Sequence, residues 1–129
     1  YVAAELRGGP GAEEFRQAMD YYGHGHYREA ADRLQECARL APADGDVLFY
    51  LGVSRLLAKD PRGASRALED AVELAPSAAL YRWYLAQAYL ERGRVDAAEA
   101  ELTLLVAAGE EYAAEAQALY RAISMARNP

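Results

Sequence analysis

Two histidines separated by one glycine, His24 and His26, are the side chains in this sequence best suited to bind a metal ion or transfer a proton. Imidazole is a frequent zinc ligand, and it is the usual general base near neutral pH. A protein zinc site needs three or four ligands, however, and no cysteine or carboxylate pattern completes a set around this pair. A surface turn is therefore the better interpretation, and we expect no bound metal.

The other chemically reactive side chains do not form a catalytic group either. Cys37 is the single cysteine, and it occupies a small-residue position where a buried, unreactive thiol is expected. The serines are too far from both histidines to suggest a nucleophile with its base, and no glycine-rich phosphate loop is present. We expect neither an enzyme nor a cofactor site. The rival interpretation is a hydrolase or transferase that uses His24 or His26, and alanine at both positions would then abolish activity.

Composition and charge narrow the class of partner. The chain has 129 residues, enough for one domain, and 53% of them are hydrophobic. Its net charge is −6 with a pI near 4.9, and the arginines are interleaved with more numerous carboxylates. Nucleic acid is therefore not expected as a partner, because phosphate binding needs a basic surface. No apolar run approaches the roughly 20 residues of a membrane span.

An interval of 34 residues connects similar residues along the chain. It relates the following sets: Ala30, Ala64 and Ala98; Leu34, Leu68 and Leu102; Ala18, Gly52 and Ala86; Pro42 and Pro76; and Phe15, Phe49 and Trp83. A fixed period of this size indicates a repeat architecture, in which one structural unit stacks on copies of itself. Stacked units form one long curved surface instead of a closed catalytic pocket, so a binding platform is favoured.

Apolar residues at helical spacing, with proline or glycine at the joints, predict seven helices and no strands. The expected ranges are 12–22, 27–40, 46–58, 61–74, 78–92, 95–108 and 111–126. Asp60 and Ser77 are candidate N-caps, and Pro61 suits a first helical turn because its missing amide has no partner to lose there. The last helix has no partner helix after it, which is how the end of an array is usually sealed.

These features resemble the tetratricopeptide repeat, a helix–turn–helix unit of 34 residues. The middle unit carries the matching residues Leu48, Leu51, Gly52, Ala64, Leu68, Ala71 and Pro76. The resemblance implies an all-α, right-handed solenoid of antiparallel helix pairs. We expect a linker over residues 1–11 and one domain over 12–129, with repeats at about 12–44, 45–78 and 79–109 and a capping helix at 111–126. Arg55 departs from the family pattern, which has tyrosine at that place.

The resemblance also implies that the first helix of each unit lines a concave groove. The groove positions form an unusually apolar set: Phe15, Met19, Tyr22, Phe49, Val53, Leu56, Leu57, Leu80, Trp83, Gln87 and Leu90. An exposed apolar stripe of this size generally marks an interaction site. We therefore expect a protein–protein interaction scaffold that binds an apolar peptide or an amphipathic helix, with Phe15, Phe49 and Trp83 as aromatic anchors.

Self-assembly is the alternative interpretation of the same groove. A second copy, residues 1–10 or the final helix could cover it, in which case the chain would be a structural module and a possible homo-oligomer. The sequence does not separate this alternative from binding of another protein.

One subset of the family, the chaperone co-factors, grips a C-terminal carboxylate with lysine, arginine and asparagine side chains. The matching places here hold Phe15, Met19, Tyr50, Leu80 and Tyr84, so this clamp is absent. Binding of a chaperone tail is therefore disfavoured.

The chain begins without methionine, and Gly8 to Gly11 form a flexible break before the array. Together with a bacterial-looking composition, these features suggest a module of a larger protein, similar to the tails of bacterial membrane-anchored regulators. The compartment stays open between cytoplasm and periplasm.

Overall fold

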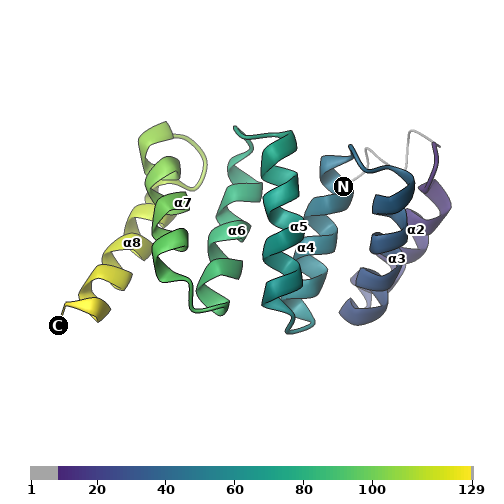
Figure 1. Cartoon of the computed structure of the whole chain (residues 1–129), viewed down its shortest axis with the longest axis horizontal. Coiled ribbons are helices and arrows are strands. Elements are labelled where there is room, and N and C mark those ends of the chain that lie inside the picture. Colours follow the sequence, from purple (N-terminus) through teal and green to yellow (C-terminus); the bar gives the residue numbers. More distant parts are fainter. Residues whose placement is uncertain (1–8, 129) are drawn as a thin grey trace.

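A computed structural model describes residues 9–128 and forms seven helices, with no strand in that range. The helices are α2 (Ala12–Gly23), α3 (Tyr27–Leu40), α4 (Gly45–Leu57), α5 (Pro61–Leu74), α6 (Ala79–Glu91), α7 (Val95–Ala108) and α8 (Ala113–Arg127). Each helix packs on the next one along the chain, and the successive pairs form one row (Figure 1). The expected all-α solenoid of helix pairs is thereby confirmed. Residues 1–8 of the predicted linker lie outside the described residues, so the domain boundary stays a prediction.

Aspartate side chains cap both helices of the middle pair. The Asp44 carboxylate accepts hydrogen bonds from the backbone N–H groups of Asp46 at 3.1 Å and Val47 at 3.3 Å. The Asp60 carboxylate accepts one from Gly63 at 3.0 Å. Each cap satisfies a backbone donor that has no partner within its helix, and is worth about 1 kcal/mol.

Three predicted helix starts are wrong by one or two residues. Helix α4 begins at Gly45 instead of residue 46, with Asp44 as its N-cap. Helix α6 has Ala78 as its N-cap without a side-chain hydrogen bond, so Ser77 is not the cap. Helix α8 begins at Ala113 instead of residue 111, because its N-cap Tyr112 adopts a left-handed conformation with φ 65°.

The turn inside each helix pair has a left-handed residue at the same place in the repeat. Gly25, Lys59 and Gly93 have φ values of 78°, 69° and 74°. Glycine adopts this conformation without strain, whereas a residue with a Cβ atom loses about 1 kcal/mol. Since Lys59 adopts it as well, the packing of the pair fixes the turn geometry in the middle unit.

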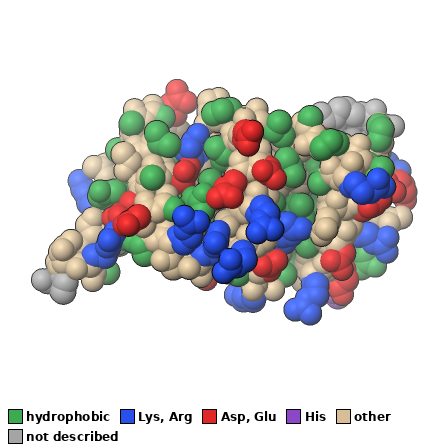
Figure 2. Space-filling model, viewed as in Figure 1, with side chains coloured by type: hydrophobic (Ala, Val, Ile, Leu, Met, Phe, Trp, Pro, Cys, Tyr) green, Lys and Arg blue, Asp and Glu red, His purple; other side chains and the backbone are tan. Residues whose placement is uncertain are grey.

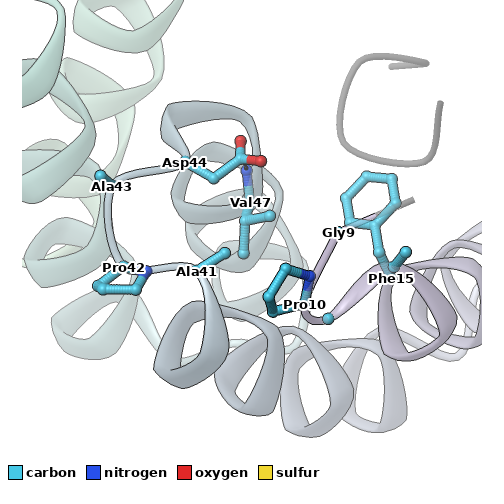
Figure 3. Close-up of a pocket in the computed structure, with 10 residues that line it drawn as sticks. Gly9, Pro10, Phe15, Ala41, Pro42, Ala43, Asp44 and Val47 are labelled. Atoms are coloured by element: carbon cyan, nitrogen blue, oxygen red, sulfur yellow. Dashed lines mark hydrogen bonds between the residues drawn. The ribbon is translucent and has the colours of Figure 1, made fainter. Parts of the chain in front are cut away.

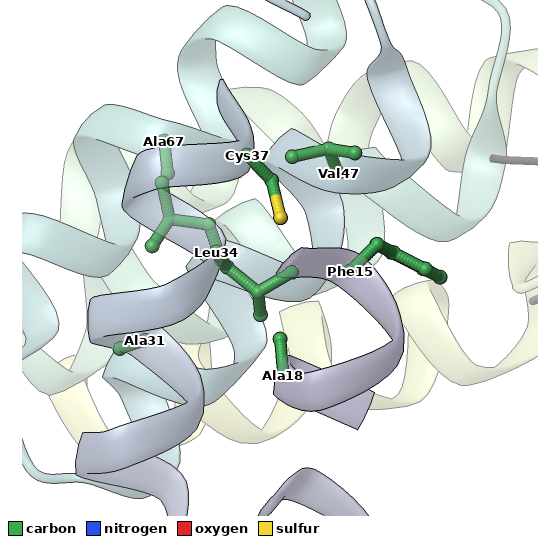
Figure 4. Packing of buried hydrophobic residues seen from close by; sticks show 8 residues of the cluster. Phe15, Ala18, Ala31, Leu34, Cys37, Val47 and Ala67 are labelled. Carbon is green, nitrogen blue, oxygen red and sulfur yellow. The ribbon is translucent and has the colours of Figure 1, made fainter. Parts of the chain in front are cut away.

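The period of 34 residues corresponds to a column of buried side chains. Leu34, Leu68 and Leu102 are all fully buried, and each lies on the second helix of its pair. Gly52 faces Leu68 at the closest approach of α4 and α5, since a Cβ atom at Gly52 would lie 2.5 Å from the Leu68 Cγ atom. Figure 4 shows the corresponding packing in the first pair, where Leu34 meets Ala18. The small residues of the period are therefore explained by helix contact.

Candidate functional site

The first helices of the pairs, α2, α4 and α6, form one layer of the solenoid, and the second helices form the other (Figure 1). Helix α4 also packs directly on α6, a closer approach than the one between α5 and α7. This contact agrees with the expectation that the first helices line the inside of the curve. We call the partly exposed surface of this layer the inner face.

Aromatic rings cross the inner face from α2 to α6. The ring of Tyr22 lies 5.6 Å from that of Tyr50, in an edge-to-face arrangement. Phe49 then lies 5.1 Å from Tyr50 and 5.4 Å from Tyr84, both again edge to face. Such pairs contribute about 0.5–1.5 kcal/mol each beyond the burial of their area, so they stabilise the packing of α2, α4 and α6. We call these rings the aromatic platform.

The tyrosine hydroxyl groups share this face. Burial raises the pKa of Tyr22, and the neighbouring phenols of Tyr50, Tyr84 and Tyr27 raise it further. Three first helices therefore direct phenol groups into one region. Among residues 9–128, the hydroxyl groups of Tyr22 and Tyr84 have no hydrogen-bond partner.

Two other tyrosines connect neighbouring helices and are already satisfied. The Tyr81 hydroxyl donates to the Asp46 carboxylate at 2.8 Å, which connects α6 to α4. The Tyr89 hydroxyl donates to Glu69 at 2.6 Å, which connects α6 to α5. Burial raises the pKa of both phenols, and the bonded carboxylates raise it further. These two tyrosines are structural, whereas Tyr22 and Tyr84 can still donate to a ligand.

The structure divides the predicted groove residues into two groups. Three are buried in core clusters below the inner face: Phe15 at 1% exposed, Phe49 at 7% and Val53 at 4%. The others are partly exposed: Met19, Tyr22, Leu56, Leu80, Trp83, Gln87 and Leu90, with Leu57 the most open at 43%. Phe15 and Phe49 therefore support the surface instead of projecting from it as anchors, because their rings fill space between helices. Which residues contact a partner stays a prediction.

Trp83 closes the other end of the array. Its ring stacks on Tyr112 at 5.4 Å with an interplanar angle of 12°, so it joins α6 to the start of α8. Nearby on α6, the Gln87 Nε2 atom is buried and has no hydrogen-bond partner within the described part of the chain.

Tyr50 and Tyr84 are absent from the predicted groove set, although both contribute to the inner face. Each follows a predicted groove aromatic directly, Phe49 or Trp83. The signal that could have found them is the residue type. A tyrosine buries its ring and keeps its hydroxyl at the surface, whereas phenylalanine prefers full burial.

The residues with possible chemistry lie elsewhere. His24 and His26 are exposed, and the His24 Nδ1 atom lies 2.8 Å from the Asp20 carbonyl oxygen. No group of three histidine, cysteine or acidic side chains that could hold a metal exists in residues 9–128. Cys37 is 1% exposed, and burial is the main cause that raises its pKa to about 11. The thiol is therefore unreactive near neutral pH.

A separate apolar hollow of about 320 Å³ lies beside the start of α2, next to the α3–α4 turn (Figure 3). Its walls include Pro10, Phe15, Pro42 and Val47. The Asp44 carboxylate at its edge is already used to cap α4. Among its described lining residues, the hollow therefore offers an apolar surface and no free polar side chain that would orient a small ligand.

Comparison with known proteins identifies the repeat. A sequence profile described as tetratricopeptide repeat matches residues 55–123, more than half of the chain, and a second profile with the same description matches residues 15–64. The chain belongs to the tetratricopeptide repeat family. No curated protein sequence matches it.

Solved tetratricopeptide repeat structures share the fold of the whole array. The translocator chaperone SycD of Yersinia enterocolitica type III secretion is 18% identical with a TM-score of 0.81, over 91% of this chain and 85% of that one. PcrH in complex with the chaperone-binding region of PopD is 19% identical with a TM-score of 0.81, over 90% and 92%. The first tetratricopeptide domain of Spaghetti (RPAP3), bound to an HSP90 peptide, is 18% identical with a TM-score of 0.81, over 93% and 94%. At these identities the likeness shows the fold.

The tetratricopeptide helices are also short. Within the described residues, none has both the length and the apolar character needed to cross a membrane.

Proposed function

We propose that this tetratricopeptide array is a protein–protein interaction scaffold that binds an apolar peptide or an amphipathic helix on its inner face. The observation that carries this function is the aromatic platform of α2, α4 and α6, in which the hydroxyl groups of Tyr22 and Tyr84 have no hydrogen-bond partner among residues 9–128. A ligand that covered the rings would remove apolar area from water, and it could accept hydrogen bonds from the two phenols.

The chemistry of the platform selects among ligands. It presents apolar rings and neutral donors, and none of the five places of the carboxylate clamp holds lysine, arginine or asparagine. The best match is therefore a segment with apolar side chains and free main-chain carbonyl groups, instead of a C-terminal carboxylate. Structures of the same fold in complex with peptides, such as SycD with a peptide of the translocator YopD, support this mode of binding.

A binding role also agrees with the chemistry of the remaining side chains. His24 and His26 are exposed on a turn, and Cys37 is a buried thiol with a raised pKa. We therefore assign no reaction to this chain, and we expect the double alanine variant of the histidines to keep every binding function.

A selected ligand tests this function without knowledge of the natural partner. Peptides are selected from a random displayed library on the wild-type chain, and their affinity is then measured by fluorescence anisotropy. We expect apolar sequences, and we expect the double variant Tyr50→Ala, Tyr84→Ala to weaken binding by about 100-fold, because buried aromatic contacts dominate interface energy. Tyr84→Phe alone should weaken it by about fivefold, through loss of one hydrogen bond.

The matched control is Tyr120→Ala on α8, a tyrosine 38% exposed outside the inner face. It should leave the affinity within about twofold. Light scattering on the same samples addresses self-assembly. If the wild type is a dimer and the double variant a monomer, the inner face is filled by a second copy. If neither peptide affinity nor mass changes while the fold stays intact, the inner face is not the binding surface.

A further inference from the structure

A group of basic side chains lies at the end of the helix pairs where α4 leads into α5 and α6 leads into α7. Figure 2 shows Lys and Arg side chains gathered over the lower middle of the molecule, below a group of acidic ones. Four members are exposed at the start of α5 and in the neighbouring turns: Lys59, Arg62, Arg66 and Arg94. Two more, Arg55 and Arg92, are partly buried. We call these six residues the basic edge. It is a local excess of positive charge in a chain whose net charge is −6.

Contacts place Arg55 and Arg92 beside the first half of α5. The Arg92 guanidinium donates to the Ser65 hydroxyl at 2.9 Å, which brings the end of α6 next to Arg66. Arg55 approaches from α4, donates to the Gly63 carbonyl at 3.2 Å and is close enough to Arg66 for the two charges to repel. Three helices therefore contribute positive charge to one area.

Within the described part of the chain, the partly buried members of the basic edge have no carboxylate as a direct partner. Arg55 donates to a backbone carbonyl and to the Gln35 amide oxygen at 3.1 Å, and Arg92 donates to a hydroxyl. Burial is the main cause that lowers the pKa of Arg55, while Asp60 and Asp32 act in the opposite direction from a greater distance. No member of the basic edge forms an ion pair within the described residues.

Arg82 is a partly buried arginine with a structural role, and it differs from Arg55 and Arg92 because it has a carboxylate partner. Its Nη1 atom lies 2.7 Å from the Glu101 carboxylate, and both side chains are 15% exposed. Partial burial of a charge without such a partner is unfavourable, so Arg55 and Arg92 are poised for a counter-charge from outside.

We propose that the basic edge is a second interaction surface, which binds an acidic segment of a partner protein through its glutamate and aspartate side chains. Bidentate pairing with carboxylates suits guanidinium groups, and five of the six residues are arginines. A long nucleic acid fits less well, because the remainder of the chain is acidic and would repel it. Two separate surfaces would let the array hold an apolar segment and an acidic one at the same time.

The test uses a fluorescent polyglutamate peptide and, as reference, a polyserine peptide of equal length. Wild-type chain should bind polyglutamate but not polyserine, with an affinity that falls as salt is raised from about 50 to 200 mM. The variant Arg62→Glu, Arg66→Glu should weaken binding by about tenfold or more. Both positions are exposed, and acidic residues early in a helix suit its dipole, so the fold should survive, which circular dichroism verifies.

The control is Arg121→Glu on α8, an exposed arginine without an ion pair among residues 9–128, and it should change the affinity by less than about twofold. Binding that is equal in the wild type and in the Arg62, Arg66 variant, or no binding at all, would overturn the proposal. Tighter binding of a single-stranded RNA of equal charge would also overturn it, because the surface would then select phosphates. The selected apolar peptide should bind the Arg62→Glu, Arg66→Glu variant with unchanged affinity. The two proposals can therefore be refuted independently of each other.

Discussion

Replacement of Gly52 by alanine should destabilise the array by about 2 kcal/mol, although alanine is the better helix former. The added Cβ atom would lie 2.5 Å from Leu68 Cγ and 2.9 Å from its Cδ2 atom. Leu68 is fully buried, so it has no space to move into, and α4 must shift away from α5. Urea unfolding followed by circular dichroism should show this loss, and the melting temperature should fall by about 8 °C.

Gly23→Ala is the matched control for this prediction. Gly23 ends α2, and an added Cβ atom would have no neighbour within 4 Å. Its effect on the free energy of unfolding should stay within about 0.5 kcal/mol. If Gly52→Ala were as stable as the wild type, α4 and α5 would not approach each other as closely as described.

Replacement of Phe49 by alanine should cost about 3–4 kcal/mol, the largest single effect that we expect. Phe49 is 7% exposed, and its ring contacts Tyr50 and Tyr84 edge to face and stacks on Tyr81 at 5.2 Å. Truncation would leave a cavity among three tyrosines and would loosen the contact between α4 and α6. Thermal and urea unfolding measure this loss directly.

Tyr22→Ala provides the comparison, since Tyr22 is partly exposed at the edge of the same platform. It should cost less than half as much stability as Phe49→Ala, and it should instead weaken ligand binding. A result in the opposite order, with Phe49→Ala as stable as the wild type, would contradict the placement of the Phe49 ring in the core.

The fold could be predicted because the same packing requirements recur in each repeat. The position of Ala64 and Ala98 must be small, and the position of Leu68 and Leu102 must be large and apolar, because the helices meet in the same geometry in each repeat. Repetition makes such positions visible in a single sequence. Helix starts were less accurate: α4, α6 and α8 begin at Gly45, Ala79 and Ala113, one or two residues away from the expected positions.

The site was harder to predict. Phe49 and Tyr50 are adjacent aromatic residues, and hydrophobicity alone does not tell which of the two faces the groove. The helix turns by about 100° between them, so one is buried while the other is partly exposed. The basic edge could not be predicted from the sequence for a different reason. Arg66 and Arg92 are far apart in the sequence, and only the packing of α5 on α6 brings them together.

The most direct test of the inner-face proposal is an NMR titration of the isotope-labelled chain with a selected apolar peptide. We expect the largest amide shifts in α2, α4 and α6, around Tyr22, Tyr50 and Tyr84, while the outward surfaces of α3, α5 and α7 stay unchanged. Shifts concentrated on α3, α5 and α7 instead, with the three tyrosines unaffected, would contradict it.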